Sequence, residues 1–389
     1  MGPKKILICG GHLSPALALI EKLKENKLYQ IIYIGRKFAL EGDKTISLEY
    51  RTIINLKIPF FTITTGRFQR FISPWFFVSL FKIPIGLIQS FVILLRVRPD
   101  LVISFGGYLS LPVCINAWLL KIPILIHEQT PIMGLSNRLI AKLSKAVCLS
   151  WPETKYVPGN TRIYLTGIPV RKSIIDPINS SILDFGDRNC PLIYITGGSL
   201  GAQSINKIIG EVLPQLVRHY RIIHQSGRAQ NERDYKNLQK IKSALPNKTK
   251  KNYKLVKLID PDEIGNILHH ADLLISRSGA NTVAEIACNG IPAILIPLPW
   301  AANNEQESNA SILEKYGLAQ IVKQSELNPK SLLTAIEKNI GKKSQSNFRR
   351  NTEYKFIATQ SVSKMTEVIS SLLSMIDLNN EKSQTFFFL

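Results

Sequence analysis

Cysteine is scarce in this sequence of 389 residues: there are five cysteines, and none belongs to a C-x-x-C pair. Their wide separation argues against a disulfide framework and against a cysteine zinc site, and it favours a reducing, cytoplasmic compartment. The five are Cys9, Cys114, Cys148, Cys190 and Cys288.

Uninterrupted apolar runs that could cross a membrane are also lacking. The longest apolar stretch, Phe71–Leu95, carries Lys82 and is cut by Pro74 and Pro84. Because a spanning helix needs about 20 consecutive apolar residues, we expect no membrane span. The basic N-terminus precedes an apolar run of only about five residues, too short for a signal peptide.

Two interpretations of this apolar stretch remain open. It can form a pair of helices partly buried in the first domain. Alternatively, it can form an interfacial patch whose apolar face enters lipid while basic side chains meet the headgroups. We expect burial combined with partial interfacial contact. The flanking basic residues are Arg67, Arg70, Arg96 and Arg98.

Acidic side chains are few: 28 Asp and Glu against 49 Lys and Arg give a net charge of +21. This excess predicts an anionic partner, which nucleic acid, an acidic membrane surface or a phosphorylated substrate would each satisfy. The lysine-rich run Lys236–Lys257 predicts a solvated helix and loop, because Tyr235 and Tyr253 form no repeated stacking platform. We therefore expect no nucleic-acid partner.

One pattern occurs twice in the chain: a short apolar run, a Gly-Gly turn and an amphipathic helical stretch, at Lys4–Lys24 and at Pro191–Leu213. Apolar runs alternating with helical patterns are typical of parallel sheets covered on both faces. The sequence therefore predicts an α/β fold with two doubly wound domains. The other runs assigned to strands are Gln30–Gly35, Leu101–Phe105, Pro123–His127, Ala146–Leu149, Arg221–Gln225, Leu273–Ser276 and Pro292–Pro297.

The domain boundary is expected within Gly167–Pro191, which is rich in proline, glycine and serine and has no sustained period. We predict a first domain over 1–170, a linker over 171–190 and a second domain over 191–350. Phe348–Met375 is helical in pattern, and its part at about 355–375 can pack back on the first domain. A frayed tail is predicted for 376–389.

Both glycine turns suit the close approach of a phosphate, because a helix begins directly after each and its positive end faces the turn. Neither Gly10-Gly11-His12 nor Gly197–Gly201 contains the G-x-G-x-x-G pattern of dinucleotide enzymes. A tight packing turn is the alternative for each. His12 lies where reactive groups of α/β enzymes are found, and the helix end favours a neutral imidazole. We interpret it as a catalytic base, with loop packing as the alternative.

Polar residues also gather in Ser276–Ala310. Ser278-Gly279 form a turn, and the helix that follows places Glu285 on one face with Asn281 and Thr282. A carboxylate there can accept two hydrogen bonds from a sugar diol, although a capping or surface role is the alternative. The loop through Gln306 supplies amide and carboxylate groups suited to hydroxyl recognition.

No spacing of His, Asp, Glu or Cys in the sequence resembles a metal site. The single D-x-D, Asp260-Pro261-Asp262, precedes a helix and is better explained by capping. His269 and His270 look structural. We therefore expect no metal and no other cofactor.

Eight motifs occurring in order resemble the MurG family of bacterial glycosyltransferases, over about residues 4–340. The resemblance implies a GT-B fold, in which two Rossmann-like doubly wound parallel-sheet domains face each other across a cleft. The motifs are GGHLSPALAL (10–19), FGGYLSLP (105–112), IPILIHEQT (122–130), NRLIAK (137–142), GIPVR (167–171), GGSLGAQSIN (197–206), HQSG (224–227) and SRSGANTVAE (276–285) with the following PLP and EQESNA.

The resemblance implies an inverting transfer of N-acetylglucosamine from UDP-GlcNAc to the C4 hydroxyl of undecaprenyl-diphosphate-MurNAc-pentapeptide, lipid I, to give lipid II. It further implies a polyprenyl-diphosphate-linked acceptor and a peripheral position on the anionic inner leaflet, at the cytoplasmic side of the cell membrane. The alternatives are a related transferase acting on another lipid such as diacylglycerol, a sugar-nucleotide epimerase, and a non-catalytic basic adaptor for membrane or nucleic acid.

Site residues follow from the same resemblance. It implies that Gly10, Gly11 and His12 face the donor sugar and acceptor, with His12 as the base. Arg171 and Ser199 would meet the donor diphosphate, Glu285 the ribose diol, Gln306 the GlcNAc hydroxyls, and Ile264 the uracil. The remaining substrate-binding positions it implies are Thr130, Gly201, Ser278, Gly279 and Ala280.

The sequence also departs from the family pattern. The first glycine loop is shorter than usual, and three positions that the family often fills otherwise hold Thr130, Ile168 and Trp300. These departures bear on the geometry of the acceptor site.

Overall fold

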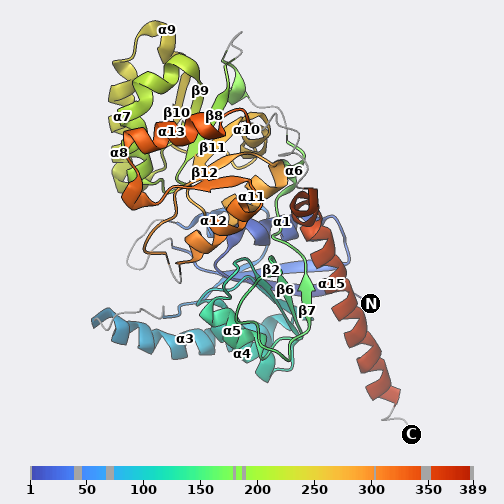
Figure 1. Ribbon diagram of the computed structural model, residues 1–389. Coiled ribbons are helices and arrows are strands. Elements are labelled where there is room, and N and C mark those ends of the chain that lie inside the picture. Colours follow the sequence, from blue (N-terminus) through green and yellow to red (C-terminus); the bar gives the residue numbers. More distant parts are fainter. Residues whose placement is uncertain are drawn as a thin grey trace. The chain divides into compact units, whose positions relative to one another are not determined.

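A computed structural model describes residues 2–38, 46–66, 74–177, 181–185, 190–301, 304–342 and 352–385 (Figure 1). The chain divides into two compact units. Unit 1 comprises Met1–Arg171 with Gln360–Leu389, and unit 2 comprises Lys172–Thr359. Each unit contains its own parallel sheet, so the α/β class with two doubly wound domains is confirmed.

The described strands of unit 1 form one sheet, in which every neighbouring pair is parallel. Short turns cannot join parallel neighbours, so helices connect them and cover both faces. In sheet order the strands are β3 (Phe60–Thr62), β2 (Tyr29–Gly35), β1 (Lys4–Cys9), β4 (Leu101–Ser104), β5 (Ile124–Glu128), β6 (Ala146–Leu149) and β7 (Ile163–Leu165).

Successive side chains of β1 pack alternately into two hydrophobic cores, one on each face of the sheet. Ile6 and Ile8 are packed in one buried cluster, and Leu7 and Cys9 in another. Successive side chains of a strand point to opposite faces, so an all-apolar strand must be covered on both. The first cluster is covered by α1 (Leu13–Lys24), α2 (Leu48–Asn55) and α15 (Thr352–Thr385), the second by α3 (Pro74–Val97), α4 (Ser110–Leu119) and α5 (Leu135–Ala141).

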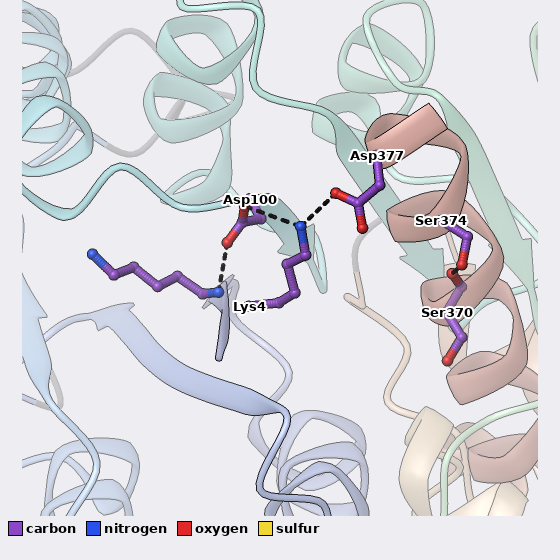
Figure 2. Close-up of polar contacts among 6 residues, drawn as sticks. Lys4, Asp100, Ser370, Ser374 and Asp377 are labelled. Carbon is purple, nitrogen blue, oxygen red and sulfur yellow. Dashed lines mark hydrogen bonds and ion pairs between the residues drawn. The ribbon is translucent and has the colours of Figure 1, made fainter. Parts of the chain in front are cut away.

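The C-terminal helix α15 is anchored to unit 1 by apolar and polar contacts. Met365 and Ile369 are completely buried against the first cluster. Further along the helix, Lys4 Nζ lies 2.5 Å from Asp377 Oδ1, and it also lies 4.0 Å from Asp100 Oδ1 (Figure 2). The hydrogen bond to Asp377 raises the pKa of Lys4. Helix α15 continues to Thr385 and thus ends later than Met375, where the sequence predicted its end.

One helix, α3, occupies the described part of the apolar stretch Phe71–Leu95. It runs through Pro84 without ending there, so the interpretation as a pair of helices is wrong. Across the described parts of the chain, no helix combines the length and apolar composition that a bilayer crossing requires. Arg67 and Arg70 lie outside the described residues.

Unit 2 has a second parallel sheet built in the same way. In sheet order its described strands are β10 (Tyr253–Val256), β9 (Arg221–Gln225), β8 (Leu192–Thr196), β11 (Leu273–Ser276), β12 (Ala293–Leu295) and β13 (Ala319–Ile321). Its helices are α6 (Lys172–Ile175), α7 (Gln203–His219), α8 (Ala229–Ser243), α9 (Asn247–Lys250), α10 (Ile264–His270), α11 (Ala280–Asn289), α12 (Glu305–Lys315) and α13 (Pro329–Asn339), with short 3₁₀ turns η1 (Ser181–Leu183) and η3 (Gln324–Glu326).

One segment of unit 2 differs from what the sequence predicts, and the predicted linker contains short helical turns. The lysine-rich run was expected to be helix and loop, but its end forms the edge strand β10. Tyr253 is buried in the core there, which the flanking lysines conceal in the sequence. The segment predicted as a linker over 171–190 contains α6 and η1, and α6 packs against α10.

Candidate active site in two glycine turns

Each sheet has one point at which the strand order changes direction. In unit 1 this point lies between β1 and β4, and in unit 2 between β8 and β11. Ligands of open α/β sheets bind at such switch points, beyond the carboxyl ends of the strands. The Gly10-Gly11-His12 turn follows β1 and the Gly197–Gly201 turn follows β8. The candidate residues therefore gather into two sets, one in each unit.

The first glycine turn packs directly on the loop after β4. Gly10 has φ +137°, and a side chain there would lie 2.8 Å from the backbone nitrogen of Phe105. Gly11 N donates to Gly106 O at 2.9 Å. Gly106 in turn leaves no room for a Cβ beside Asn137. Glycine is therefore required at Gly10 for the two loops to touch, and at Gly106 for its positive φ and the contact with Asn137.

His12 is half-buried at the start of α1. Its Nδ1 lies 2.9 Å from the carbonyl oxygen of Phe105. A carbonyl only accepts, so Nδ1 donates the proton and the neutral ring keeps its lone pair on Nε2. The geometry thus provides an imidazole whose Nε2 can accept a proton, as a general base requires.

Behind this histidine lies a second one, His127, at the end of β5. It is completely buried, and burial lowers its pKa to about 4, so the ring is neutral at pH 7. His127 Nε2 lies 2.8 Å from Gly167 O, and its Nδ1 lies 3.1 Å from Gln129 Nε2. Gln129 Nε2 also lies 3.4 Å from Phe105 O, the carbonyl that holds His12. A buried polar chain therefore supports the carbonyl that orients His12.

Glu128 closes the loop that follows β5. Its Oε1 accepts from Thr130 N at 3.0 Å and lies 2.8 Å from Thr130 Oγ1. Its Oε2 accepts from Gly134 N at 3.0 Å and from Asn137 Nδ2 at 2.9 Å. Several donors compensate the burial of this carboxylate. The backbone amide and hydroxyl of Thr130 are thus engaged within the protein.

Arg171 is the last residue of the N-terminal segment of unit 1 and is only 8% exposed. The nearby departure Ile168 is buried at 3% exposure, so it serves packing at this position. In unit 2, by contrast, the departure Trp300 is 72% exposed.

The second glycine turn is interlocked with the turn after β9. Gly201 has φ +87°, and a Cβ there would lie 2.0 Å from Ser226 O. Gly227 has φ +82°, and a Cβ there would lie 2.2 Å from Gly201 N. The crossing leaves Ser199 exposed at the crest of the turn, just before α7. Helix α7 has no acidic residue in its first turn, which leaves its positive end available to an anion.

A chain of buried, hydrogen-bonded side chains supports the contact between the two turns. Asn206 Nδ2 donates to Ser226 O at 2.9 Å and to Asp234 Oδ2 at 2.8 Å. Its Oδ1 accepts from His224 Nε2 at 3.0 Å, and His224 Nδ1 accepts from Tyr253 OH at 2.8 Å. Burial lowers the pKa of His224 to about 3, so this ring is neutral and can act as both donor and acceptor.

At the switch point of unit 2, Ser278 and Gly279 lie between β11 and α11, and Ala280 is the first residue of α11. Ser278 is fully buried, and its hydroxyl donates to Gln306 O at 2.7 Å. Gly279 caps α11, which has no acidic residue in its first turn. Glu285 is half-buried on the next turn and raises the pKa of Tyr194 through its charge, although burial is the larger cause.

Gln306 and Ile264 lie in the first turns of two other helices of unit 2, α12 and α10. Gln306 Oε1 accepts from Leu298 N at 3.0 Å, which leaves the side-chain NH₂ as its group for a ligand. Ile264 is the first residue of α10, and Gly265 beside it packs on Ser173 O. Asp260 Oδ1 accepts from Asp262 N at 3.0 Å, so the D-x-D forms a turn before this helix.

Within the described residues, no three His, Cys, Asp or Glu side chains are grouped as a metal site would need.

Comparisons with known proteins agree with this arrangement. The glycosyltransferase family 28 N-terminal domain matches residues 9–149, and the glycosyltransferase family 28 C-terminal domain matches residues 192–369. The crystal structure of Acinetobacter baumannii MurG has a TM-score of 0.65 and 25% identity, covering 95% of this chain and 100% of that chain. A curated relative from Clostridium novyi is 32% identical over 97% of this chain and 99% of its own length. The chain belongs to the MurG family.

The Clostridium novyi relative is named UDP-N-acetylglucosamine--N-acetylmuramyl-(pentapeptide) pyrophosphoryl-undecaprenol N-acetylglucosamine transferase. A relative of the same name from Carboxydothermus hydrogenoformans is 35% identical over 82% of this chain and 82% of its own length. The GT-B class expected from the MurG family resemblance is thereby confirmed.

Several residues around the two turns were missed by reasoning from residue types. Phe105, Gln129 and Asn206 act through backbone carbonyls or buried chains, which no local pattern reveals. A signal existed for one group: the apolar strand ending in His127-Glu128-Gln129 places three polar residues at the carboxyl end of β5. In the sequence, that motif stands out only as part of the MurG family resemblance.

Proposed function

We propose that this chain transfers N-acetylglucosamine from UDP-GlcNAc to a lipid-linked muramoyl acceptor, lipid I, to give lipid II. The observation that carries the proposal is the presence of a glycine turn at the switch point of each sheet. It occurs in a chain whose relatives bear this activity in their names at 31% identity or more over most of their length.

His12 is proposed as the base. Its Nε2 accepts the proton of the acceptor C4 hydroxyl while the hydroxyl oxygen forms a bond to C1 of the sugar. The bond from C1 to the diphosphate oxygen breaks, and UDP leaves with that electron pair. Attack and departure on opposite faces invert the configuration at C1.

The donor diphosphate is proposed to lie against the second glycine turn. Ser199 and Gly201 present the backbone there, the positive end of α7 faces it, and Arg171 contributes a guanidinium. We propose that these groups neutralise the leaving UDP without a metal ion. The Ser278–Ala280 turn is proposed to border the same pocket, at the start of α11.

The rest of the donor is assigned by chemistry. Glu285 would accept from the ribose diol, and the side-chain NH₂ of Gln306 would donate to the GlcNAc hydroxyls. Ile264 would contact uracil at the start of α10. Gly10, Gly11 and the Thr130 loop are proposed to border the donor sugar and the acceptor. Because the polar groups of Thr130 are engaged with Glu128 and Ile132, its contribution would be to shape the loop.

Docking on an anionic lipid surface is also proposed, through the exposed side of α3. Apolar side chains there recur at the helical spacing: Ile88 is 66% exposed and Val92 57% exposed, with Ile85, Phe91 and Leu95 beside them. Arg96 and Arg98 follow at the end of the helix. We call Ile85, Ile88, Phe91, Val92 and Leu95 the α3 apolar face. An apolar stripe beside basic residues suits a surface of anionic headgroups.

The decisive experiment is a transfer assay with radiolabelled UDP-GlcNAc and either lipid I or diacylglycerol as acceptor. We expect a labelled product with lipid I only, and unchanged activity after dialysis against EDTA. Label in diacylglycerol alone would assign the chain to the alternative transferase. Absence of UDP binding, with salt-dependent binding to nucleic acid instead, would favour the adaptor.

A further inference from the structure

Arg277 follows β11 at its carboxyl end and uses its guanidinium entirely within unit 2. Its Nη1 donates to Ile296 O at 2.9 Å and to Pro297 O at 3.2 Å. Its Nη2 donates to Ser204 Oγ at 2.8 Å and to Gln324 Oε1 at 2.6 Å. The side chain thus ties the ends of β11 and β12 to α7 and η3.

All four acceptors of Arg277 are uncharged. Among the described residues, no carboxylate forms an ion pair with this guanidinium. The side chain is half-buried, and its desolvation lowers the pKa of Arg277, although an arginine still keeps its charge at neutral pH. An unpaired, partly desolvated cation is costly, so its presence calls for a compensating charge from outside the protein.

The surroundings of Arg277 increase this positive potential. Ser204 lies in the first turn of α7, and Gly279, two residues after Arg277, is the N-cap of α11. Neither helix has an acidic residue in its first turn or a side-chain cap. The guanidinium contacts Ser204 and so lies beside the positive end of α7, where a bound anion would offset the repulsion between the two.

We propose that Arg277 is a positioning residue that supplies the charge selecting a diphosphate at the switch point of unit 2. It would act without leaving its four protein acceptors: it holds the loops after β11 and β12 in place, and its field favours the phosphates of the nucleotide over the nucleoside alone. The inference rests on the proposed function, because it assigns the anion as the donor diphosphate.

The test compares the affinities of the full-length protein for UDP and for uridine, measured by calorimetry with competition for the weaker ligand. The Arg277→Gln variant removes the charge, and we expect the ratio of UDP affinity to uridine affinity to fall about tenfold, the scale of one screened charge. Arg277→Lys keeps the charge but loses the fourfold hydrogen bonding. Its ratio should stay within about twofold of wild type although its thermal stability falls.

A second variant, which leaves Arg277 in place, keeps the proposal testable even if Arg277→Gln does not fold. Gln324→Glu has nearly the same shape and places a carboxylate at the 2.6 Å contact, where it would neutralise the guanidinium. We expect the same loss of UDP selectivity, about tenfold, with uridine affinity unchanged.

Arg221→Gln is the matched control. Arg221 is the first residue of β9 and so lies at the amino ends of the strands, opposite to Arg277. Its Nε donates to Cys190 O at 2.7 Å. Removing the charge of Arg221 should leave the ratio of UDP affinity to uridine affinity unchanged. Equal losses of UDP and uridine affinity in the Arg277→Gln and Gln324→Glu proteins, or an equal effect in the control, would overturn the proposal. If the wild type binds no UDP, the proposed function itself fails.

Discussion

At the scale of single residues, hydrogen bonding decides which nitrogen of His12 is reactive. The ring is held by one backbone carbonyl, that of Phe105, through Nδ1. Gln129 and His127 lie behind the same carbonyl and restrict its movement. Because His127 is neutral at pH 7, it adds no repulsion against a proton arriving on His12. The base role remains a prediction, and kinetics can test it.

Replacing His12 by alanine removes the proposed proton acceptor but leaves the proposed donor-binding residues of unit 2 unchanged. We expect kcat to fall by about 10²–10⁴-fold while the KM for UDP-GlcNAc changes little. Steady-state kinetics with lipid I would measure both. The exposed His219, at the end of α7, provides the control, because His219→Ala should leave both constants unchanged. Near-normal turnover of His12→Ala would remove it as the base.

Glu285→Gln tests the proposed contact with the ribose. The amide keeps the shape of the side chain but accepts hydrogen bonds less strongly, so we expect the KM for UDP-GlcNAc to rise about tenfold. The kcat should change by less than about threefold, because the ribose lies away from the reacting carbon. Glu307→Gln, at an exposed position of α12, is the control. An unchanged KM would refute the role of Glu285.

At the scale of elements, helix α3 has apolar side chains both on the side that packs on the sheet and on the side exposed to solvent. Its inner face packs on the sheet through Leu94, and Asn116 of α4 donates to Ser90 Oγ at 2.8 Å. Its outer face is apolar although exposed to solvent. A helix that is apolar on both its buried and its exposed side indicates a second surface to be covered.

The Ile88→Ser, Val92→Ser double variant tests this outer face. Each exposed side chain that enters lipid contributes about 1–3 kcal/mol, so binding to phosphatidylglycerol vesicles should weaken at least about tenfold. Cosedimentation measures the change. Ile54→Ser, an exposed position of α2, is the control. Equal binding of the double variant and the wild type would contradict docking through the α3 apolar face.

Helix α15 stabilises unit 1 by burial. Ile369 is completely buried in the first cluster, so Ile369→Ala should lower the free energy of unfolding by about 2–4 kcal/mol. Urea unfolding followed by circular dichroism measures this difference. Met375→Ala, at a side chain that is 43% exposed on the same helix, should cost less than about 1 kcal/mol. Similar losses in both variants would show that α15 contributes little packing.

At the scale of the whole molecule, two buried neutral histidines couple stability to pH. Each unit contains one: His127 with a pKa of about 4 and His224 with a pKa of about 3. In the unfolded chain both titrate near 6.5. Between pH 6.5 and about 4, the unfolded chain therefore binds more protons than the folded protein, and acid favours unfolding.

We expect the thermal unfolding temperature to be highest near pH 7 and to fall as the pH is lowered toward 5. Each histidine contributes at most about 1.4 kcal/mol per pH unit in this range. Calorimetry at both pH values measures the shift. The His224→Gln variant should be less stable at pH 7 but less sensitive to acid. The same pH dependence in the variant and the wild type would exclude His224 as a source.

The sequence by itself determined the class of fold and the place of the glycine turns. Buried, mostly apolar runs such as Leu273–Ser276 are strands because only a sheet covered on both faces buries every side chain of such a run. Gly10 and Gly197 follow directly after β1 and β8, and both positions require glycine because the loops have no room for a Cβ. Short edge strands such as β3 and β13 escaped prediction, since three half-exposed or exposed residues are too few to show a strand pattern.

Only the tertiary structure decided which loops meet. Phe105 lies 93 residues from His12 in the chain, yet parallel pairing of β1 with β4 places its carbonyl against the imidazole. Arg277 and Gln324 meet because the sheet order brings the ends of distant strands together. Residue types reveal which groups can react, whereas their partners depend on long-range strand order, which no local pattern encodes.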